Sequence, residues 1–213
     1  ESQDADVKNK PMIRYKEGLS QNTIWVNESL GIDPATGEEI FLDMNGNKVN
    51  EWSSANYKPF GSTDPKVYGT IGTMFVYKKW ELNAYMYYKY GGYLYNSTLV
   101  DKIENVNPNE NGDKRILYDR WNAPGDVAKF KKVSDVSVTN PTSRFVEKEN
   151  YIQLQSLSLS YDFSGDQLRK MGIQRLKVSA IGNDIFKSST VKMERGTSYP
   201  YARTFSLSAQ VTF

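Results

Sequence analysis

The eleven residues Arg203–Phe213, R-T-F-S-L-S-A-Q-V-T-F, decide the fold class of this chain. From Phe205 onward every second residue is apolar, and every residue between them is polar. Alternate residues of a β-strand point to opposite faces, so this strand has one apolar and one polar face. A tilted strand needs about 9–11 residues to cross a bilayer. The stretch therefore predicts a transmembrane β-barrel strand with lipid on one face and a polar lumen on the other.

Other segments carry the same strand signal, and Trp80–Tyr90 alternates most cleanly. The full set is Val67–Tyr77, Trp80–Tyr90, Tyr151–Phe163, Arg175–Phe186 and Arg203–Phe213, with a further strand start at Met12–Tyr15. Lys78-Lys79 forms a tight polar corner between the first two strands of this set. The pattern predicts an all-β fold of about five, or six, antiparallel strands in a meander.

The connections between these segments alternate in length. Gly18–Pro65 and Gly91–Asn150 are long, Lys78-Lys79 is short, Ser164–Gln174 is of medium length and Lys187–Ala202 is intermediate. We expect one helical turn at Asp166–Lys170 within Ser164–Gln174, and a small hairpin around Asn45-Gly46. Membrane barrels have long extracellular loops and short periplasmic turns. We therefore assign Lys78-Lys79 and Ser164–Gln174 to the periplasmic side, and the extracellular side receives Gly18–Pro65, Gly91–Asn150 and Lys187–Ala202. Five or six strands cannot close a barrel, and we therefore expect the C-terminal piece of a larger protein.

The composition excludes several classes of function. Among 213 residues there is no Cys and no His, and the formal net charge is +2. Disulfides, thiolate or imidazole metal sites and His-dependent nucleophiles are thereby excluded, and no basic footprint for nucleic acid exists. No carboxylate spacing singles out an acid–base pair, so we predict that the chain is not an enzyme. The 15 Tyr, 4 Trp and 9 Phe fit the aromatic girdles of a membrane barrel.

Candidate site residues lie in the long connections and on one strand. Tyr93, Tyr95, Tyr118 and Trp121 are candidates for stacking on sugar rings or packing against peptide, with girdle or loop packing as the alternative. Tyr85, Tyr87 and Lys89 lie on the polar face of Trp80–Tyr90, and we expect them to face the lumen and contact a plug or the cargo.

Two acidic loops are candidates for calcium binding. They are Asp43–Asn47 and Asn107–Asp113. Their oxygen-bearing side chains alternate around a glycine, as in calcium loops. Neither loop has the bidentate Glu that completes such a site, and Asn-Gly turns are the plainer explanation. We therefore predict no catalytic or structural metal, with calcium in these loops as the alternative.

Six blocks of sequence resemble one family. They are G-I-D-P-A-T-G-E (31–38), D-P-K-V-Y-G (64–69), Y-K-K-W-E-L (77–82), Ser143–Tyr161, Gly172–Phe186 and Tyr199–Phe213. In this order they resemble the C-terminal portion of a SusC/RagA-family TonB-dependent outer-membrane transporter. The resemblance covers residues 11–213, so we place residues 1–213 in the C-terminal part of one receptor barrel, without its plug and upstream strands.

The resemblance implies several properties of the whole protein. It implies a 22-stranded barrel with an N-terminal plug, located in the bacterial outer membrane and energised through TonB. It also implies a SusD-like surface lipoprotein as partner, outer-membrane lipid around the wall, and import of oligosaccharides or oligopeptides. No cofactor and no nucleic acid are implied.

Three alternatives remain open at this point. A soluble carbohydrate-binding β-sandwich has the same period-2 alternation, since an apolar strand face can point to a protein core as well as to lipid. A SusC-like barrel with a structural or assembly role would lack transport. An outer-membrane hydrolase would need a nucleophile and a base that these residues do not show.

Overall fold

The computed structural model describes residues 11–106, 114–192 and 203–213. The chain forms two compact units, which are described separately. The sheet unit contains residues 66–91 and 149–213, and the loop unit contains residues 1–65 and 92–148. Both are built from antiparallel strands, so the predicted all-β class is confirmed.

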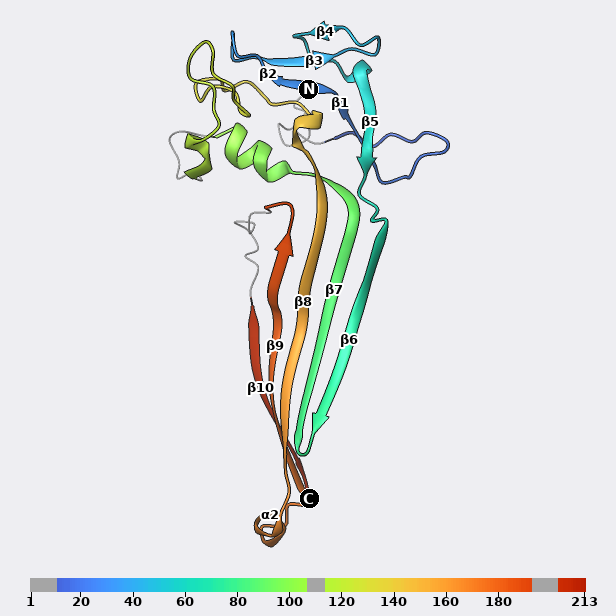
Figure 1. Ribbon diagram of the computed structural model, residues 1–213, viewed down its shortest axis with the longest axis vertical. Helices are drawn as coiled ribbons and strands as arrows, with labels where there is room; N and C mark the ends of the chain where they lie inside the picture. The colour runs from blue at the N-terminus through green and yellow to red at the C-terminus, as the bar shows by residue number, and fades with distance from the viewer. Residues whose placement is uncertain (1–10, 107–113, 193–202) are drawn as a thin grey trace, which may run out of the picture. The chain divides into compact units, whose positions relative to one another are not determined.

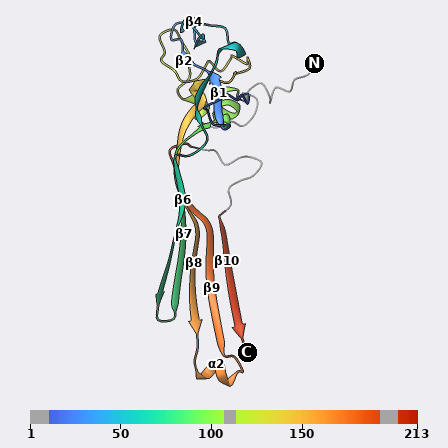
Figure 2. The same cartoon turned by 90° about the vertical axis from the view of Figure 1, so that its right-hand side faces the viewer.

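Five strands form the sheet unit in the order β10-β9-β8-β7-β6 (Figure 1). They are β6 (Val67–Tyr77), β7 (Trp80–Tyr95), β8 (Val146–Phe163), β9 (Arg175–Ser189) and β10 (Thr204–Thr212), and the last residues of β7 and the first of β8 belong to the loop unit. Consecutive strands lie side by side, and the short helix α2 (Asp166–Lys170) lies in the connection from β8 to β9 (Figure 2). The predicted meander and the predicted helical turn are therefore confirmed.

Strand β7 is longer than the sequence predicts, because Gly91-Gly92 does not end it. Gly91 adopts a φ of +86°, which glycine reaches without steric cost, and its N–H donates to the Asn150 side chain at 2.7 Å. The strand thereby continues to Tyr95. The prediction that the strand ends before this glycine pair is therefore wrong, because glycine within a strand also marks a bend or bulge.

The register of the sheet separates apolar and polar side chains onto two faces. Leu207 pairs with Ala180, which pairs with Leu159, so one apolar row crosses three strands. On the same face Leu207 is 84% exposed and Phe205 is 73% exposed. The opposite face carries hydroxyl groups, and Ser160 Oγ donates to Ser179 Oγ at 2.8 Å.

The loop unit contains the two segments that the sequence analysis assigned to long connections. Its strands are β1 (Thr23–Asn27) paired with β5 (Tyr57–Ser62), and a small sheet of β2 (Ser29–Ile32), β3 (Glu39–Leu42) and β4 (Lys48–Val49). Its helical turns are η1 (Ser54–Asn56), η2 (Leu99–Glu104), η3 (Lys114–Leu117) and η4 (Ser143–Phe145). The hairpin at Asn45-Gly46 is confirmed by the pairing of β3 with β4. Met12 forms only an isolated bridge with Trp25, so the strand start predicted at Met12–Tyr15 is absent from the described residues.

A hydrophobic core holds the loop unit together. Val26, Val100 and Ile103 are fully buried, and Phe145 is nearly so. Asn27 is also fully buried, where its N–H donates to the Pro141 carbonyl at 3.3 Å and its side chain donates to the Ser53 carbonyl at 3.0 Å. Residues more than a hundred positions apart are thus joined at the centre of this unit. Within the described ranges, no helix has the length and apolarity needed to cross a membrane.

Candidate functional site

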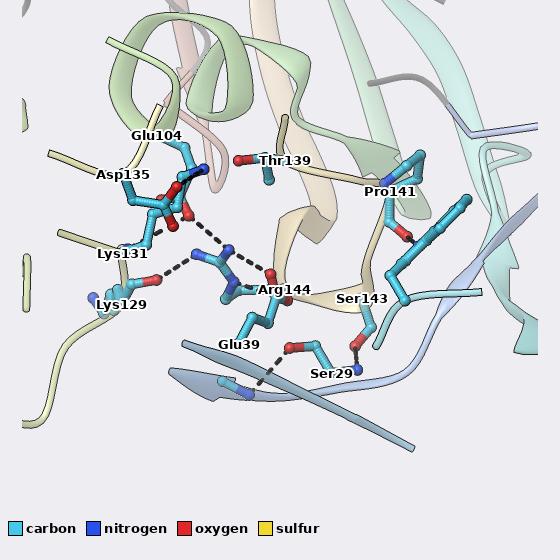
Figure 3. A network of polar contacts seen from close by, with 12 residues as sticks. Ser29, Glu39, Glu104, Lys129, Lys131, Asp135, Thr139, Pro141, Ser143 and Arg144 are labelled. Atoms are coloured by element: carbon cyan, nitrogen blue, oxygen red, sulfur yellow. Dashed lines mark hydrogen bonds and ion pairs between the residues drawn. The ribbon is translucent and has the colours of Figure 1, made fainter. Parts of the chain in front are cut away.

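A buried ionic network joins three segments of the loop unit around Arg144 (Figure 3). The Arg144 guanidinium donates to both carboxylate oxygens of Glu39, at 3.2 and 2.8 Å, and to Glu104 Oε1 at 2.8 Å. Its Nη1 donates to the Lys129 carbonyl at 2.6 Å. The Arg144 side chain is 11% exposed and that of Glu104 is 0% exposed. The network therefore fixes β3, η2 and η4 to one another.

Burial and charge act on the Arg144 guanidinium in opposite directions. Burial alone would lower its pKa, but the carboxylates of Glu39 and Glu104 outweigh this and raise the pKa above its ordinary value. Glu104 Oε2 is buried without a hydrogen-bond partner among the described residues. The second buried arginine, Arg120, donates to the carbonyls of Ile116 and Lys131 at 2.7 and 2.9 Å, and burial lowers its pKa. Such a network is rigid while complete and costly when one member is lost.

A polar cavity of about 370 Å³ lies beside this network in the loop unit. Phe41 and Trp52 form part of its apolar wall, and Glu39, Lys131 and Asp135 supply charges of both signs. Lys131 Nζ lies 3.6 Å from Asp135 Oδ1 and donates to the Ser137 hydroxyl at 3.2 Å. Burial lowers the pKa of Lys131. An aromatic wall with convergent polar groups is the chemistry that binds a sugar or a peptide.

The four aromatic residues predicted to bind cargo do not form one cluster with shared contacts. The Tyr93 ring lies against Gly61, where an added Cβ would lie 2.6 Å from Tyr93 Cδ2. Tyr95 packs against Phe145 with ring centroids 6.2 Å apart, and burial raises the pKa of its hydroxyl. Tyr95 also lines a second cavity of the loop unit, of about 400 Å³. These contacts match the packing alternative for Tyr93 and Tyr95, and their contact with cargo stays a prediction.

The other two aromatic candidates differ in exposure. Trp121 Nε1 donates to the Pro34 carbonyl at 2.9 Å, and its ring covers Gly37, so Trp121 holds the turn before β3. Tyr118 is 60% exposed. Of the four, Tyr118 thus has the side chain most available to a ligand, and its role also stays a prediction.

The three residues predicted to face the lumen share the polar face of β7. The Tyr85 ring lies over Gly72 of β6, and Tyr87 lies 5.7 Å from Tyr151 of β8 between ring centroids. Lys89 Nζ forms an ion pair with Glu149 Oε2 at 2.7 Å. The register places the three on one face of the sheet, while the identity of that face as a lumen stays a prediction.

The acidic loop at Asp43–Asn47 is organised by its own backbone. The Asp43 carboxylate accepts the N–H groups of Asn45 and Asn47, each at 2.8 Å, and the Asn47 side-chain amide at 3.0 Å. The hydrogen bond from the Asn47 side chain is the main reason why the pKa of Asp43 is lowered. The second loop, 107–113, lies outside the described residues. Across the ranges that are described, no group of three or more Asp and Glu side chains could hold a metal ion.

Sequence reasoning missed the Arg144 network and the polar cavity beside it. Glu39, Glu104 and Arg144 lie in three separate segments, and no spacing relates them. The one available signal was the quoted block 143–161, which contains Arg144. Only the fold brings these charges together.

Comparison with known proteins gives one sequence relative and several solved structures. No family model matches the chain. TonB-dependent receptor P3 of Formosa agariphila is 24% identical over 206 residues, which cover 87% of this chain and 20% of that receptor. The RagAB peptide importer in its open-open state matches with a TM-score of 0.72 at 17% identity, over 95% of this chain and 25% of that one. Its closed-closed state matches with a TM-score of 0.71 at 18% identity, over 90% of this chain and 23% of that one.

The chain thus spans about a fifth of the curated relative and about a quarter of the solved chains that it matches. These relatives are receptors and transporters rather than enzymes, in agreement with the prediction that the chain is not an enzyme. The sequence relative and the shared fold together confirm the resemblance to SusC/RagA-family TonB-dependent outer-membrane transporters that the sequence motifs predicted.

Proposed function

We propose that this chain supplies wall strands and external loops to an outer-membrane barrel that imports oligosaccharides or oligopeptides. The whole barrel has 22 strands, and energy reaches it through TonB. A SusD-like surface lipoprotein is its partner. In this function the sheet unit separates lipid from lumen, and the loop unit contacts cargo or partner outside the membrane.

The observation that carries the proposal is the exposed apolar face of the sheet unit, which has aromatic residues at both ends. At one end the ring centroids of Trp80 and Tyr161 lie 4.7 Å apart, and Phe163 packs on Tyr161 at 4.6 Å. Tyr88 and Tyr90 lie further along the same face of β7. The ten steps from Trp80 to Tyr90 measure about 33 Å along a strand. A strand tilted by about 40° then covers about 25 Å, the height of the apolar band in membrane barrels.

The opposite face of the sheet unit holds its charges in pairs. Lys177 Nζ lies 2.7 Å from Glu81 Oε2, and Lys89 Nζ lies 2.7 Å from Glu149 Oε2. Charged side chains on a lipid face are destabilising, whereas a polar lumen tolerates them. The placement of these pairs supports the lumen assignment of Tyr85, Tyr87 and Lys89.

The geometry does not favour the soluble sandwich. A sandwich requires a second layer on the apolar face of the sheet. In the described part of the sheet unit, no layer covers Phe205 and Leu207. The outer edges of β6 and β10 likewise have no strand partner among the described residues, which supports further strands on both sides.

The experiment that tests the proposal uses the full-length gene in its own bacterium. We expect the protein in the outer-membrane fraction, together with a surface lipoprotein that co-purifies with it. Cells that lack the gene, or that lack TonB, should lose uptake of either labelled oligopeptides or labelled oligosaccharides. Uptake of a small sugar that passes through porins is the control and should not change. Recovery of the protein in the soluble fraction would overturn the proposal.

A further inference from the structure

We propose that a cavity at the α2 end of the sheet unit binds one phospholipid with an amino headgroup, of the phosphatidylethanolamine type. This inference rests on the proposed function, because it requires the apolar face of the sheet to contact lipid. The lipid's phosphate lies against Lys79, its ammonium lies against Asp166, and one acyl chain follows the apolar face of the strands.

The walls of this cavity are apolar and belong to the lipid-facing side of the sheet. The cavity measures about 450 Å³, within the range of about 300–1,000 Å³ for ligand sites. Tyr161, Phe163 and Leu176 line it from β8 and β9, and Phe163 pairs with Leu176 in the sheet register. Leu168 and Met171 close it from the side of α2. An occupant therefore needs an apolar part that continues onto the sheet.

The cavity also contains one cationic and one anionic side chain that do not pair with each other. Lys79 Nζ donates to the Ser164 carbonyl at 2.9 Å, which uses one of its three N–H groups. Asp166 lines the cavity, and its carboxylate has no hydrogen bond or ion pair in the described part of the chain. The phosphate of a phospholipid accepts from an ammonium group, and an ethanolamine headgroup donates to a carboxylate. An amino phospholipid satisfies both side chains, whereas a purely anionic lipid leaves Asp166 opposed by like charge.

The turn next to the cavity supports a role for its lysines. Lys78 adopts a φ of +54°, in the region that favours glycine, and its Nζ lies 5.3 Å from the centre of the Tyr77 ring. Two-residue turns between antiparallel strands commonly place their residues at positive φ, so this conformation belongs to the tight turn between β6 and β7. The turn carries two consecutive lysines where we place the membrane surface on the short-turn side, and basic residues there attract lipid phosphates.

The test uses the full-length protein, purified in detergent and freed of lipid. Phosphatidylethanolamine, phosphatidylglycerol and phosphatidylcholine are added separately, and bound lipid is counted by native mass spectrometry. We expect one phosphatidylethanolamine to be retained at least about tenfold more tightly than either other lipid. Lys79→Gln and Asp166→Asn should each reduce this affinity about tenfold. Lys192→Gln removes an exposed charge three residues beyond the opposite end of β9 and should change nothing.

Two further results separate this inference from the proposed function. Soluble phosphoethanolamine, which has the headgroup charges without the chains, should not compete with the lipid. Equal binding of the three lipids, or no effect of the Lys79 and Asp166 substitutions, would overturn the lipid site. If the protein is nevertheless recovered from the outer membrane, the proposed function stands and only the lipid site is lost.

Discussion

The sheet unit and the loop unit distribute apolar and charged side chains in opposite ways. The sheet unit exposes Phe205 and Leu207 and holds its ion pairs on one face, whereas the loop unit buries Val26 and Val100. The loop unit also buries the Glu104 carboxylate within its network. Each arrangement suits a different surrounding, since apolar surface is stable against hydrocarbon and a closed core is stable against water. The comparison implies that substitutions of the same kind have different effects in the two units.

The largest expected effect comes from removing the centre of the buried network in the loop unit. Arg144→Met leaves the fully buried Glu104 carboxylate without its cation, and breaking a buried pair in this way costs about 3–5 kcal/mol. We expect hydrogen exchange of full-length protein to become much faster in 99–104 and 129–131, while the strands of the sheet unit keep their protection.

Lys132→Met is the control for this prediction, because Lys132 is exposed and takes no part in the network. It should leave exchange in both segments unchanged. If Arg144→Met and Lys132→Met behave alike, the network contributes no net stability. If Arg144→Met instead loosens β6 to β10, the two units do not unfold independently.

The next effect tests which face of the sheet contacts lipid in the proposed barrel. Leu207→Arg places a charge on the apolar face of β10. An arginine on the lipid face of a membrane barrel lowers its stability by about 2–4 kcal/mol at the middle of the bilayer. Ser208→Arg is the matched control, because it places the same side chain one residue further on the polar face. We expect Leu207→Arg to lower the outer-membrane level and thermal stability of full-length protein, and Ser208→Arg to affect both little. The reverse order would show that the faces are assigned the wrong way round.

Glycine substitutions test how rings are packed in the two units. An added Cβ at Gly72 lies 2.8 Å from Tyr85 Cε1, and one at Gly37 lies 2.6 Å from the Trp121 ring, so each Gly→Ala change costs about 1–3 kcal/mol. Gly37 also has a φ of +75°, whereas Gly72 is not among the positive-φ glycines. When Gly72→Ala is combined with Tyr85→Ala, most of the loss of stability caused by Gly72→Ala should therefore disappear. When Gly37→Ala is combined with Trp121→Ala, much of the loss caused by Gly37→Ala should remain. Double-mutant cycles on thermal stability measure both couplings.

The sheet unit could be predicted from the sequence because its signal is local. In β7 and β10 apolar and polar side chains alternate for nine residues or more, and the predicted ranges of β6 and β10 match the observed strands closely. The strands of the loop unit have two to six residues, too few for a period to be read among many turn residues. The Arg144 network could not be predicted, because its members are 40 and 105 positions apart and only tertiary contacts join them.

The smallest expected effect is an acid sensitivity confined to the loop unit. Burial opposes ionisation of Asp135, but hydrogen bonds from Ser137 and the ammonium of Lys131 outweigh it and hold the pKa of Asp135 below its ordinary value of 3.8. A carboxylate with a lowered folded pKa contributes stability that is fully present above about pH 4 and is lost as the pH falls through the folded pKa. We expect Asp135→Asn to cost less than about 1 kcal/mol at pH 7 and to reduce the loss of stability between pH 4 and pH 2. Hydrogen exchange at 129–139, corrected for the intrinsic pH dependence, measures this effect. An unchanged acid profile would show that Lys131 and Ser137 do not favour the ionised form.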